Sequence, residues 1–500
     1  MGFELQQERK WERSDRLLVF LLITIPCALR LWIQVPLDND TFFLLSHGRY
    51  VLQHGLPSLE PFTFHEGLRF VMQQWLTASI FYYIYSVFDY NGLYVLAFVL
   101  YVLYGYSAYR LSMLLSNDNM PISATAALLV CVGMGYFIVL RPWLFSGLIF
   151  LAEFYCLELH IKTRKSGYLV FLPMLSLLLI NLHAAVWPLF FVFLVPYVLD
   201  GLRIPIKTPS LHQYGARPIL LFGILAFLAG LANPYFLDAM LYFYNSYGNK
   251  YVNIFIIEMG TPSFKDMRGL VIFAMYAFVA IAYAINKAGT SRMRYVFLTL
   301  LTAYMGLSSA RNVQYFLLTA PFLAYYYRDF DIIAATNCYK KKPDIYTYSK
   351  VGLVIILYSI IIFGAPRNSE KKFFETFVPA RAIDFLLQNF DTQSIRLFND
   401  YDTGDFLEFK GIRTFIDSRA EVFFKSNNGK EDILDDYFEV LLGKVHYMDL
   451  VKKYRFTHYL VIRGTLMDTY LSRDNAFALL YQDEKYRIFE GLDALGVVLP

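Results

Sequence analysis

The sequence predicts an α-helical polytopic membrane protein of about eleven transmembrane helices, followed by a C-terminal soluble α/β domain. The chain is 57% hydrophobic and 17% charged, with a mean hydropathy of +0.41, which is outside the range of ordinary soluble proteins. Apolar runs of about twenty residues recur between residues 17 and 363, long enough to cross a hydrocarbon core of roughly 30 Å. From residue 367 onward charges become frequent and apolar runs shorten, as in a soluble domain.

Basic residues predict the orientation of the chain, because lysine and arginine favour the cytoplasmic side of a bilayer. Four basic residues precede the first apolar run, and further basic clusters lie at 162–165, 203–217, 287–294 and 340–342. All of them fall inside if the spans lie near 17–35, 93–115, 120–140, 143–161, 168–183, 184–200, 218–235, 269–286, 294–309, 312–328 and 350–365. We therefore expect a cytoplasmic N-terminus (1–16), a transmembrane domain (17–366) and an extracytoplasmic C-terminal domain (367–500).

This threading requires that the segment 75–88 does not cross the membrane. It has about fourteen strongly apolar residues, which is short for a span and typical of an interfacial or re-entrant helix. We therefore place it in a first outer loop with interfacial helices, residues 36–92.

The same orientation brings ionisable residues from distant parts of the chain to the outer membrane face. They follow the first span or occupy later outer turns and loops: Asp38, Asp40, Arg141, His183, Glu258 and Arg311. Ionisable groups near the hydrocarbon boundary are expensive and usually have a partner or a task. Each also has a structural interpretation: an aspartate can cap a helix, an arginine can snorkel to headgroups and a histidine can be a hydrogen-bonded packing residue. Glu258, alone in an apolar stretch, is the hardest to explain in that way.

These residue types suit chemistry on a lipid-phosphate-linked sugar. A carboxylate at the membrane surface can act as general base for an attacking hydroxyl. Arginine and histidine can stabilise the charge of a departing phosphate. The sequence has no glycine-rich phosphate loop, which argues against an ATP-driven pump, and it has neither a Cys/His metal spacing nor a nucleic-acid signature.

Several motifs are spread over nearly the whole chain: Leu37-Asp38-Asn39-Asp40-Thr41, Gly48-Arg49-Tyr50, Gln74-Trp75-Leu76, Arg141-Pro142-Trp143, Asn181-Leu182-His183, Asn233-Pro234-Tyr235, Ala310-Arg311-Asn312, Phe398-Asn399-Asp400-Tyr401 and Ile416-Asp417-Ser418-Arg419. These motifs resemble the GT-C glycosyltransferases, in particular the protein mannosyltransferase and lipid A aminoarabinose transferase type, and a bacterial branch with a C-terminal extracytoplasmic domain.

The resemblance implies a catalytic acidic residue in the first outer loop, which we assign to Asp40. Asp38 is the alternative base, or it positions the acceptor. A second acidic residue near the outer end of the third span is common in the superfamily, but this chain has Arg141-Pro142 there. A two-carboxylate mechanism is therefore in question, and Glu258 could supply the second carboxylate. No cofactor is assigned; the metal ligands are unknown, and a divalent cation is left open.

The expected activity is transfer of a sugar from a polyprenyl-phosphate-linked donor to an extracytoplasmic acceptor, a glycan, lipid or polymer of the envelope. Asp40 or Asp38 would be the base, and Arg141, His183 and Arg311 would bind the phosphate, with Glu258 beside them. The protein would lie among membrane lipids in the bacterial plasma membrane and bind no nucleic acid. Two alternatives remain at this point: a lipid-linked glycan flippase, and a non-catalytic scaffold of an envelope-synthesis complex.

The C-terminal region has patterns of both strands and helices. Segments 413–416 and 458–462 predict strands, and 380–390 and 432–442 predict amphipathic helices. Asp400 to Asp402 should follow one short strand, and Asp417 and Arg419 another, where they could contact an acceptor. The alternative for the last two is a buried Asp–Arg pair that holds the domain together.

Overall fold

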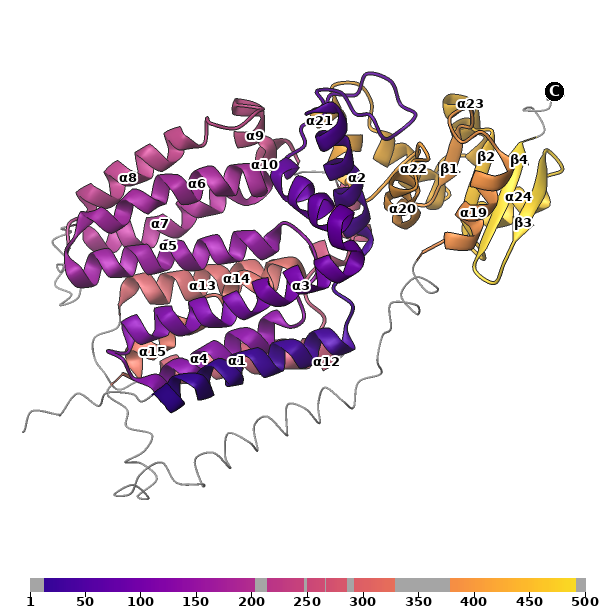
Figure 1. The fold of residues 1–500 in the computed structure, drawn as a ribbon. Coiled ribbons are helices and arrows are strands. Elements are labelled where there is room, and N and C mark those ends of the chain that lie inside the picture. Colours follow the sequence, from indigo (N-terminus) through magenta and orange to yellow (C-terminus); the bar gives the residue numbers. More distant parts are fainter. Residues whose placement is uncertain are drawn as a thin grey trace, which may run out of the picture.

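The computed structural model describes residues 13–202, 214–246, 250–265, 267–285, 292–328 and 378–491. A bundle of helices forms one part of the molecule and a smaller α/β region the other, with helix α2 between them (Figure 1). The expected last span (350–365) and the basic cluster at 340–342 lie outside the described residues.

The bundle consists of long helices joined by short helical turns. Its elements are α1 (Arg13–Ile33), α2 (Asn39–His54), α3 (Trp75–Leu115), α4 (Met120–Met134), α5 (Trp143–Thr163), η1 (Ser166–Val170), α6 (Phe171–Leu182), η2 (Ala184–Val186), α7 (Trp187–Gly201), α8 (Ala216–Ala229), α9 (Leu237–Met240), α10 (Tyr242–Asn245), α11 (Lys250–Phe255), η3 (Ile257–Met259), α12 (Met267–Ala284), α13 (Met293–Ser308), η4 (Ala310–Asn312), α14 (Val313–Leu317), η5 (Ala320–Phe322) and α15 (Leu323–Tyr326).

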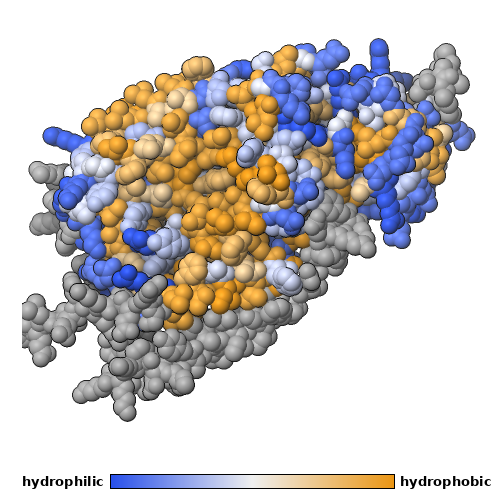
Figure 2. All heavy atoms as spheres, viewed as in Figure 1, coloured by the Kyte–Doolittle hydropathy of each residue, from blue (hydrophilic) through white to orange (hydrophobic). Residues whose placement is uncertain are grey.

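Four of the described helical stretches are long and apolar enough to cross a membrane: Asp15–Ile33, Trp75–Leu115, Trp143–Thr163 and Ala184–Gly201. Further apolar helices are shorter, among them Met120–Met134 and Ala216–Ala229. On the face that Figure 2 shows, apolar residues cover most of the middle of the bundle, whereas the α/β region is mostly hydrophilic. Because exposed apolar surface on this scale is costly in water, the distribution fits a bundle surrounded by lipid.

Helix α3 changes direction at Asp89, whose backbone is non-helical (φ 55°, ψ −156°). A positive φ is strained for aspartate, so this residue marks a true break between two helices. The break separates residues 75–88 from the rest of α3, at the boundary that the sequence predicts between an interfacial segment and the second span.

The expected span 312–328 is not one regular helix. The chain forms η4, α14, η5 and α15 in succession, with Pro321 inside the irregular stretch. Proline lacks the backbone N–H that continues a helix, which explains part of the interruption.

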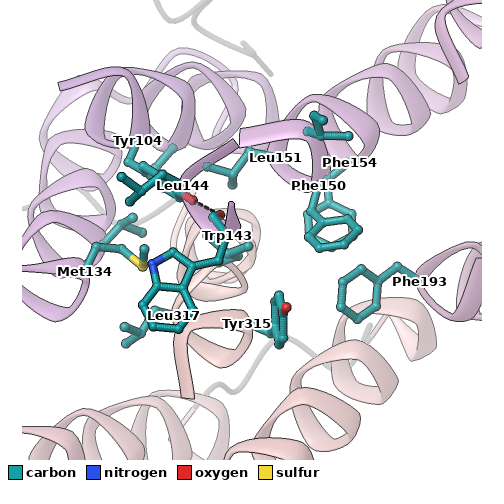
Figure 3. Packing of buried hydrophobic residues seen from close by; sticks show 14 of the residues in the cluster. Tyr104, Met134, Trp143, Leu144, Phe150, Leu151, Phe154, Phe193, Tyr315 and Leu317 are labelled. Atoms are coloured by element: carbon teal, nitrogen blue, oxygen red, sulfur yellow. Dashed lines mark hydrogen bonds between the residues drawn. The ribbon is translucent and has the colours of Figure 1, made fainter. Parts of the chain in front are cut away.

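Aromatic residues fill the bundle's interior around Trp143 (Figure 3). The hydroxyl of Tyr104 donates a hydrogen bond to the Trp143 carbonyl (3.0 Å), and the indole N–H donates to the Phe137 carbonyl (3.0 Å). Phe150 packs edge-on against Phe193, with ring centroids 4.9 Å apart. The start of α5 is therefore fixed by packing and by hydrogen bonds at once.

The C-terminal region contains a four-stranded sheet of order β1-β2-β4-β3, in which β1 and β2 are parallel and the other pairs antiparallel. Its elements are α19 (Ala380–Asn389), β1 (Leu397–Asn399), η6 (Tyr401–Thr403), α20 (Gly404–Phe409), η7 (Ala420–Phe423), α21 (Lys425–Asn428), α22 (Ile433–Leu441), α23 (Tyr447–Tyr454), β2 (His458–Ile462), α24 (Leu466–Arg473), β3 (Phe477–Gln482) and β4 (Tyr486–Gly491).

Three of the predicted C-terminal elements are present: α19, α22 and β2. The strand predicted at 413–416 is wrong, because only Thr414 forms an isolated bridge, to Thr63 of the first loop. The apolar residues Phe415 and Ile416 are both fully buried, in a core shared with that loop. Burial on both sides of an irregular segment produced the apolar pattern that resembled a strand.

The loop after α1 packs into the C-terminal region as well as against the bundle. Phe64, Phe70 and Met72 share a buried core with C-terminal residues such as Phe415. On α2, Phe42 contacts Phe406 edge-on (4.9 Å between centroids), while the next residues point into the bundle core. Helix α2 thus joins the two parts through apolar contacts on opposite faces.

Candidate functional site

A cavity of about 830 Å³ lies between the bundle and the C-terminal region, a size usual for small-molecule sites. All six ionisable residues that the predicted orientation brought to one membrane face line it: Asp38, Asp40, Arg141, His183, Glu258 and Arg311. They come from parts of the chain that are far apart in sequence. The cavity is therefore the candidate active site.

Asp38 is the N-cap of α2. One carboxylate oxygen accepts hydrogen bonds from the backbone N–H and the hydroxyl of Thr41 (3.1 and 3.0 Å), and the Thr41 hydroxyl lies 3.2 Å from the Asp38 N–H, completing a capping box. The other oxygen contacts the Arg141 guanidinium. Both carboxylate oxygens of Asp38 thus have partners. Asp38 caps helix α2, which is the structural interpretation that the sequence analysis gave for an aspartate at this position.

Arg141 is held in place through the backbone of the turn between α4 and α5. The N–H of Leu140 donates to the Pro36 carbonyl (2.9 Å), which ties this turn to the chain just before Asp38. The Trp143 ring lies against the guanidinium, 4.8 Å from its carbon. These contacts explain why a residue about one hundred positions away in sequence faces the first-loop carboxylates.

Three carboxylates surround the Arg141 guanidinium. Its Nε contacts Asp38, and its Nη1 lies 3.0 Å from an oxygen of Asp40 and 3.0 Å from an oxygen of Glu258. If all three carboxyl groups are ionised, the cluster carries a net charge of −2. Protonation of one of the carboxylates would reduce this net negative charge.

The pKa of Asp40 departs from the usual value of a carboxyl group. Burial raises the pKa of Asp40 to about 7; Arg141 opposes the rise, and the Asp38 and Glu258 carboxylates add to it. A carboxyl group that titrates near neutrality beside a cavity is suited to accepting a proton during a reaction.

Glu258 and Arg311 lie on segments that are bonded to each other. The Ser309 hydroxyl donates to the Glu258 carbonyl (3.0 Å), and the Ala310 N–H donates to the Gly260 carbonyl (2.9 Å). The guanidinium of Arg311 contacts the sulfur of Met259 (3.3 Å) and forms no ion pair with the described residues. Arg311 therefore presents a positive charge to the cavity that no described carboxylate neutralises.

His183 lies in the turn between α6 and η2. A hydrogen bond joins its Nδ1 and the Ser146 hydroxyl (2.8 Å). The turn itself is held by the segment before α3: the Ala184 N–H donates to the Gln73 carbonyl (2.9 Å), and the Thr77 hydroxyl donates to the Leu182 carbonyl (2.7 Å). The first loop thus positions the imidazole at the cavity wall.

Arg30 is a cavity residue that the sequence analysis missed. It lies in the last turn of α1, where its Nε donates to the Gly135 carbonyl (2.9 Å) and its guanidinium stacks on Tyr136. Like Arg311, it forms no ion pair within the described parts of the chain. An arginine within the first apolar run was the available signal, because a charge inside a span is costly.

The C-terminal region supplies one wall of the cavity. Its lining residues there include Tyr401, Asp402, Ser418 and Glu421. Asn39, between the two aspartates, donates a side-chain hydrogen bond to the Asp402 carbonyl (2.9 Å). The chain around Asp402 is therefore bonded to the residue next to the candidate base Asp40.

Asp417 and Arg419 follow no strand, contrary to the sequence prediction, and their side chains form a buried ion-pair network. The Arg419 guanidinium, 2% exposed, contacts Asp417 (2.5 Å), Glu408 (2.6 Å) and Glu60 of the first loop (2.9 Å). His47 of α2 lies 3.0 Å away. Burial works against it, yet the Arg419 guanidinium holds the pKa of Asp417 below its usual value. The buried-pair alternative therefore describes these two side chains.

The side chain of Asp400 forms hydrogen bonds within the C-terminal region. One carboxylate oxygen accepts a hydrogen bond from the Ile462 N–H at the end of β2 (2.8 Å), and the other lies 3.5 Å from the Tyr437 hydroxyl. Burial raises the pKa of Asp400 to about 6. Asp402, rather than Asp400, is the residue of this segment that lines the cavity.

No family model and no curated protein sequence matches the chain. Two solved structures are similar to it over most of its length. One is an oligosaccharyltransferase from Archaeoglobus fulgidus, tethered to an acceptor peptide, with a TM-score of 0.53 and 11% identity over 90% of this chain and 69% of the other. The second is ArnT from Cupriavidus metallidurans bound to undecaprenyl phosphate, with a TM-score of 0.53 and 12% identity over 95% and 97%. The chain therefore has the GT-C fold that these two structures share.

Proposed function

We propose that this protein transfers a sugar from a polyprenyl-phosphate-linked donor to an acceptor hydroxyl or amine at the extracytoplasmic face of the plasma membrane. The observation that carries the proposal is one cavity that is lined both by a carboxyl group of raised pKa and by arginines without an ion-pair partner among the described residues. The fold likeness supports the reaction class, and the lipid bound to ArnT suggests the chemical class of the donor.

Asp40 is the proposed general base. With a pKa of about 7 it is partly ionised at neutral pH and binds a proton readily, which is the compromise that base catalysis requires. Asp38 is less suited because its two oxygens already serve the cap of α2 and Arg141. In this role Asp40 removes the acceptor's proton as the acceptor attacks the anomeric carbon and the polyprenyl phosphate departs.

Arg311 and Arg30 are the proposed phosphate ligands, with His183 beside them. Their guanidinium groups line the cavity without a carboxylate partner among the described residues, so their charge is available to a phosphate. Arg141, which the sequence also suggested for this role, spends its charge on three carboxylates. We therefore propose that Arg141 interacts with the general base Asp40 and does not bind the departing phosphate.

The test measures release of polyprenyl phosphate from a panel of polyprenyl-phosphate sugars by purified protein in detergent. We expect Asp40→Asn to abolish release while donor binding and thermal unfolding stay unchanged, because only the proton acceptor is lost. Arg311→Ala should instead weaken binding of polyprenyl phosphate by about tenfold or more, the usual value of a charged hydrogen bond. Asp238→Asn, an exposed aspartate outside the cavity, is the matched control.

Full release by Asp40→Asn would contradict the proposal. Movement of an intact lipid-linked sugar across vesicle membranes, without its consumption, would instead favour the flippase alternative.

A further inference from the structure

The carboxylate cluster of the cavity has a cation built into it. Asp38, Asp40 and Glu258 come from two separate segments, and all three contact the one guanidinium of Arg141. Carboxylate oxygens are the ligands that Mg²⁺, Mn²⁺ or Ca²⁺ prefers, so a group of three carboxylates raises the question of a metal site. In this protein the guanidinium of Arg141 lies among the three carboxylates, where a metal ion would otherwise bind.

The geometry suits a planar cation better than a metal ion. The carboxylates address different nitrogens of the guanidinium, Asp38 at Nε and the other two at Nη1, so their oxygens are spread around a plane. A metal ion would require these oxygens to lie within about 2.0–2.6 Å of a single point. Among the residues that the structure describes, no group of three carboxylate, histidine or cysteine side chains is arranged to hold a metal ion.

The guanidinium is also fixed in its place. The Trp143 ring covers it at 4.8 Å, and Trp143 is itself held by hydrogen bonds and by buried aromatic neighbours (Figure 3). The backbone of the preceding residue is bonded to Pro36. Loss of this guanidinium from the cluster would leave three partly buried carboxylates without a cation, which is unfavourable.

We propose that the guanidinium of Arg141 takes the place of a divalent cation in this cavity, and that the protein binds no divalent cation among Asp38, Asp40 and Glu258. Arg141 is then a positioning residue that orients Asp40 and limits the repulsion between the carboxylates. The inference that sugar transfer needs no divalent cation rests on the proposed function. The inference that no divalent cation binds among the three carboxylates is independent of it.

The first experiment measures Mn²⁺ binding by electron paramagnetic resonance and needs no substrate. We expect the wild-type protein and its Glu258→Gln variant to bind the same small amount of Mn²⁺, because Glu258 is engaged with Arg141. Arg69→Ala, which removes an exposed arginine, should behave like the wild type. Stoichiometric Mn²⁺ in the wild type that is lost in both Glu258→Gln and Asp38→Asn would overturn the proposal.

The second experiment measures release of polyprenyl phosphate after exhaustive chelation. We expect the wild type to keep its activity, Arg141→Ala to lose about 100-fold, and guanidinium chloride to restore a part of that loss while Mn²⁺ does not. Loss of wild-type activity on chelation with recovery in Mn²⁺, or failure of guanidinium to restore the variant in its folded state, would contradict the inference. If the wild type releases nothing under any condition, the proposed function fails while the Mn²⁺ measurement still decides the occupancy.

Discussion

Replacement of Glu258 by glutamine should lower the pKa of Asp40. The Glu258 carboxylate is one of the groups that raise this pKa, so its neutralisation removes a repulsion that disfavours ionised Asp40. The glutamine keeps the size of the side chain and can still accept a hydrogen bond from Arg141. The substitution therefore removes the negative charge of Glu258 and changes little else.

The magnitude follows from the distances around Arg141. Oxygens of Asp40 and Glu258 each lie 3.0 Å from Nη1, so they are no more than about 6 Å apart. Two unit charges at ~6 Å repel by ~0.7 kcal/mol in water and by ~3 kcal/mol at an effective dielectric constant of ~20. Since one pKa unit corresponds to ~1.4 kcal/mol, the shift lies between about half a unit and two units. Glu258 is 35% exposed, and we therefore expect a fall of about one unit, from about 7 to ~6.

Infrared titration provides the assay, because a protonated carboxyl group has its own carbonyl stretch. The band of Asp40 is identified by its absence in Asp40→Asn and followed against pH in the wild type and in Glu258→Gln. The reasoning would be refuted by an unchanged or raised midpoint in Glu258→Gln. If Asp40 is the base, the pH–rate profile should shift in the same direction, since the ionised form becomes available at lower pH.

Two further predictions concern the packing that holds the cavity together. Arg419→Met should destabilise the protein by about 3–5 kcal/mol, because it leaves buried carboxylates without their cation; the thermal unfolding midpoint in detergent measures this, and a loss no greater than that of the exposed Arg69→Met would refute it. Gly48→Ala should cost about 1–3 kcal/mol, because its Cβ would lie 2.0 Å from the Ala78 carbonyl oxygen where α2 crosses α3. Gly167→Ala, whose Cβ meets nothing within 4 Å, is the control, and equal stability of the two variants would contradict the packing argument.

Elements with a clear period were the predictable part of the fold. Helices α5, α19 and α22 and strand β2 lie within two residues of their predicted ends, because α5 is a long and largely apolar run, α19 and α22 each have one apolar face, and β2 is a short apolar run. The segment 75–88 was predicted not to cross the membrane from charge placement and from its short apolar length, and this stays a prediction. Helix α3 is broken at Asp89, directly after this segment.

The arrangement of the cavity was only partly predictable. The positive-inside rule placed its ionisable residues on one face, but the pairing of Arg141 with three carboxylates depends on a turn that is bonded to Pro36. Likewise, Glu408 lies in a short helix and Glu60 in a loop, and such charged residues are usually solvated. Only the fold shows that both are buried against Arg419.

The loop that carries Glu258 is attached to the C-terminal region by aromatic residues. The Tyr242 hydroxyl donates to Glu421 (2.6 Å), the Tyr251 hydroxyl donates to Glu439 (3.0 Å), and Phe255 stacks on Phe438 with centroids 4.4 Å apart. A displacement of the C-terminal region that also breaks the Ser309–Glu258 hydrogen bond would therefore carry Glu258 away from Arg141 and Asp40. Thermodynamic linkage then requires that any ligand which displaces this region also changes the proton affinity of Asp40, and that protonation of Asp40 changes the affinity for that ligand by the same factor.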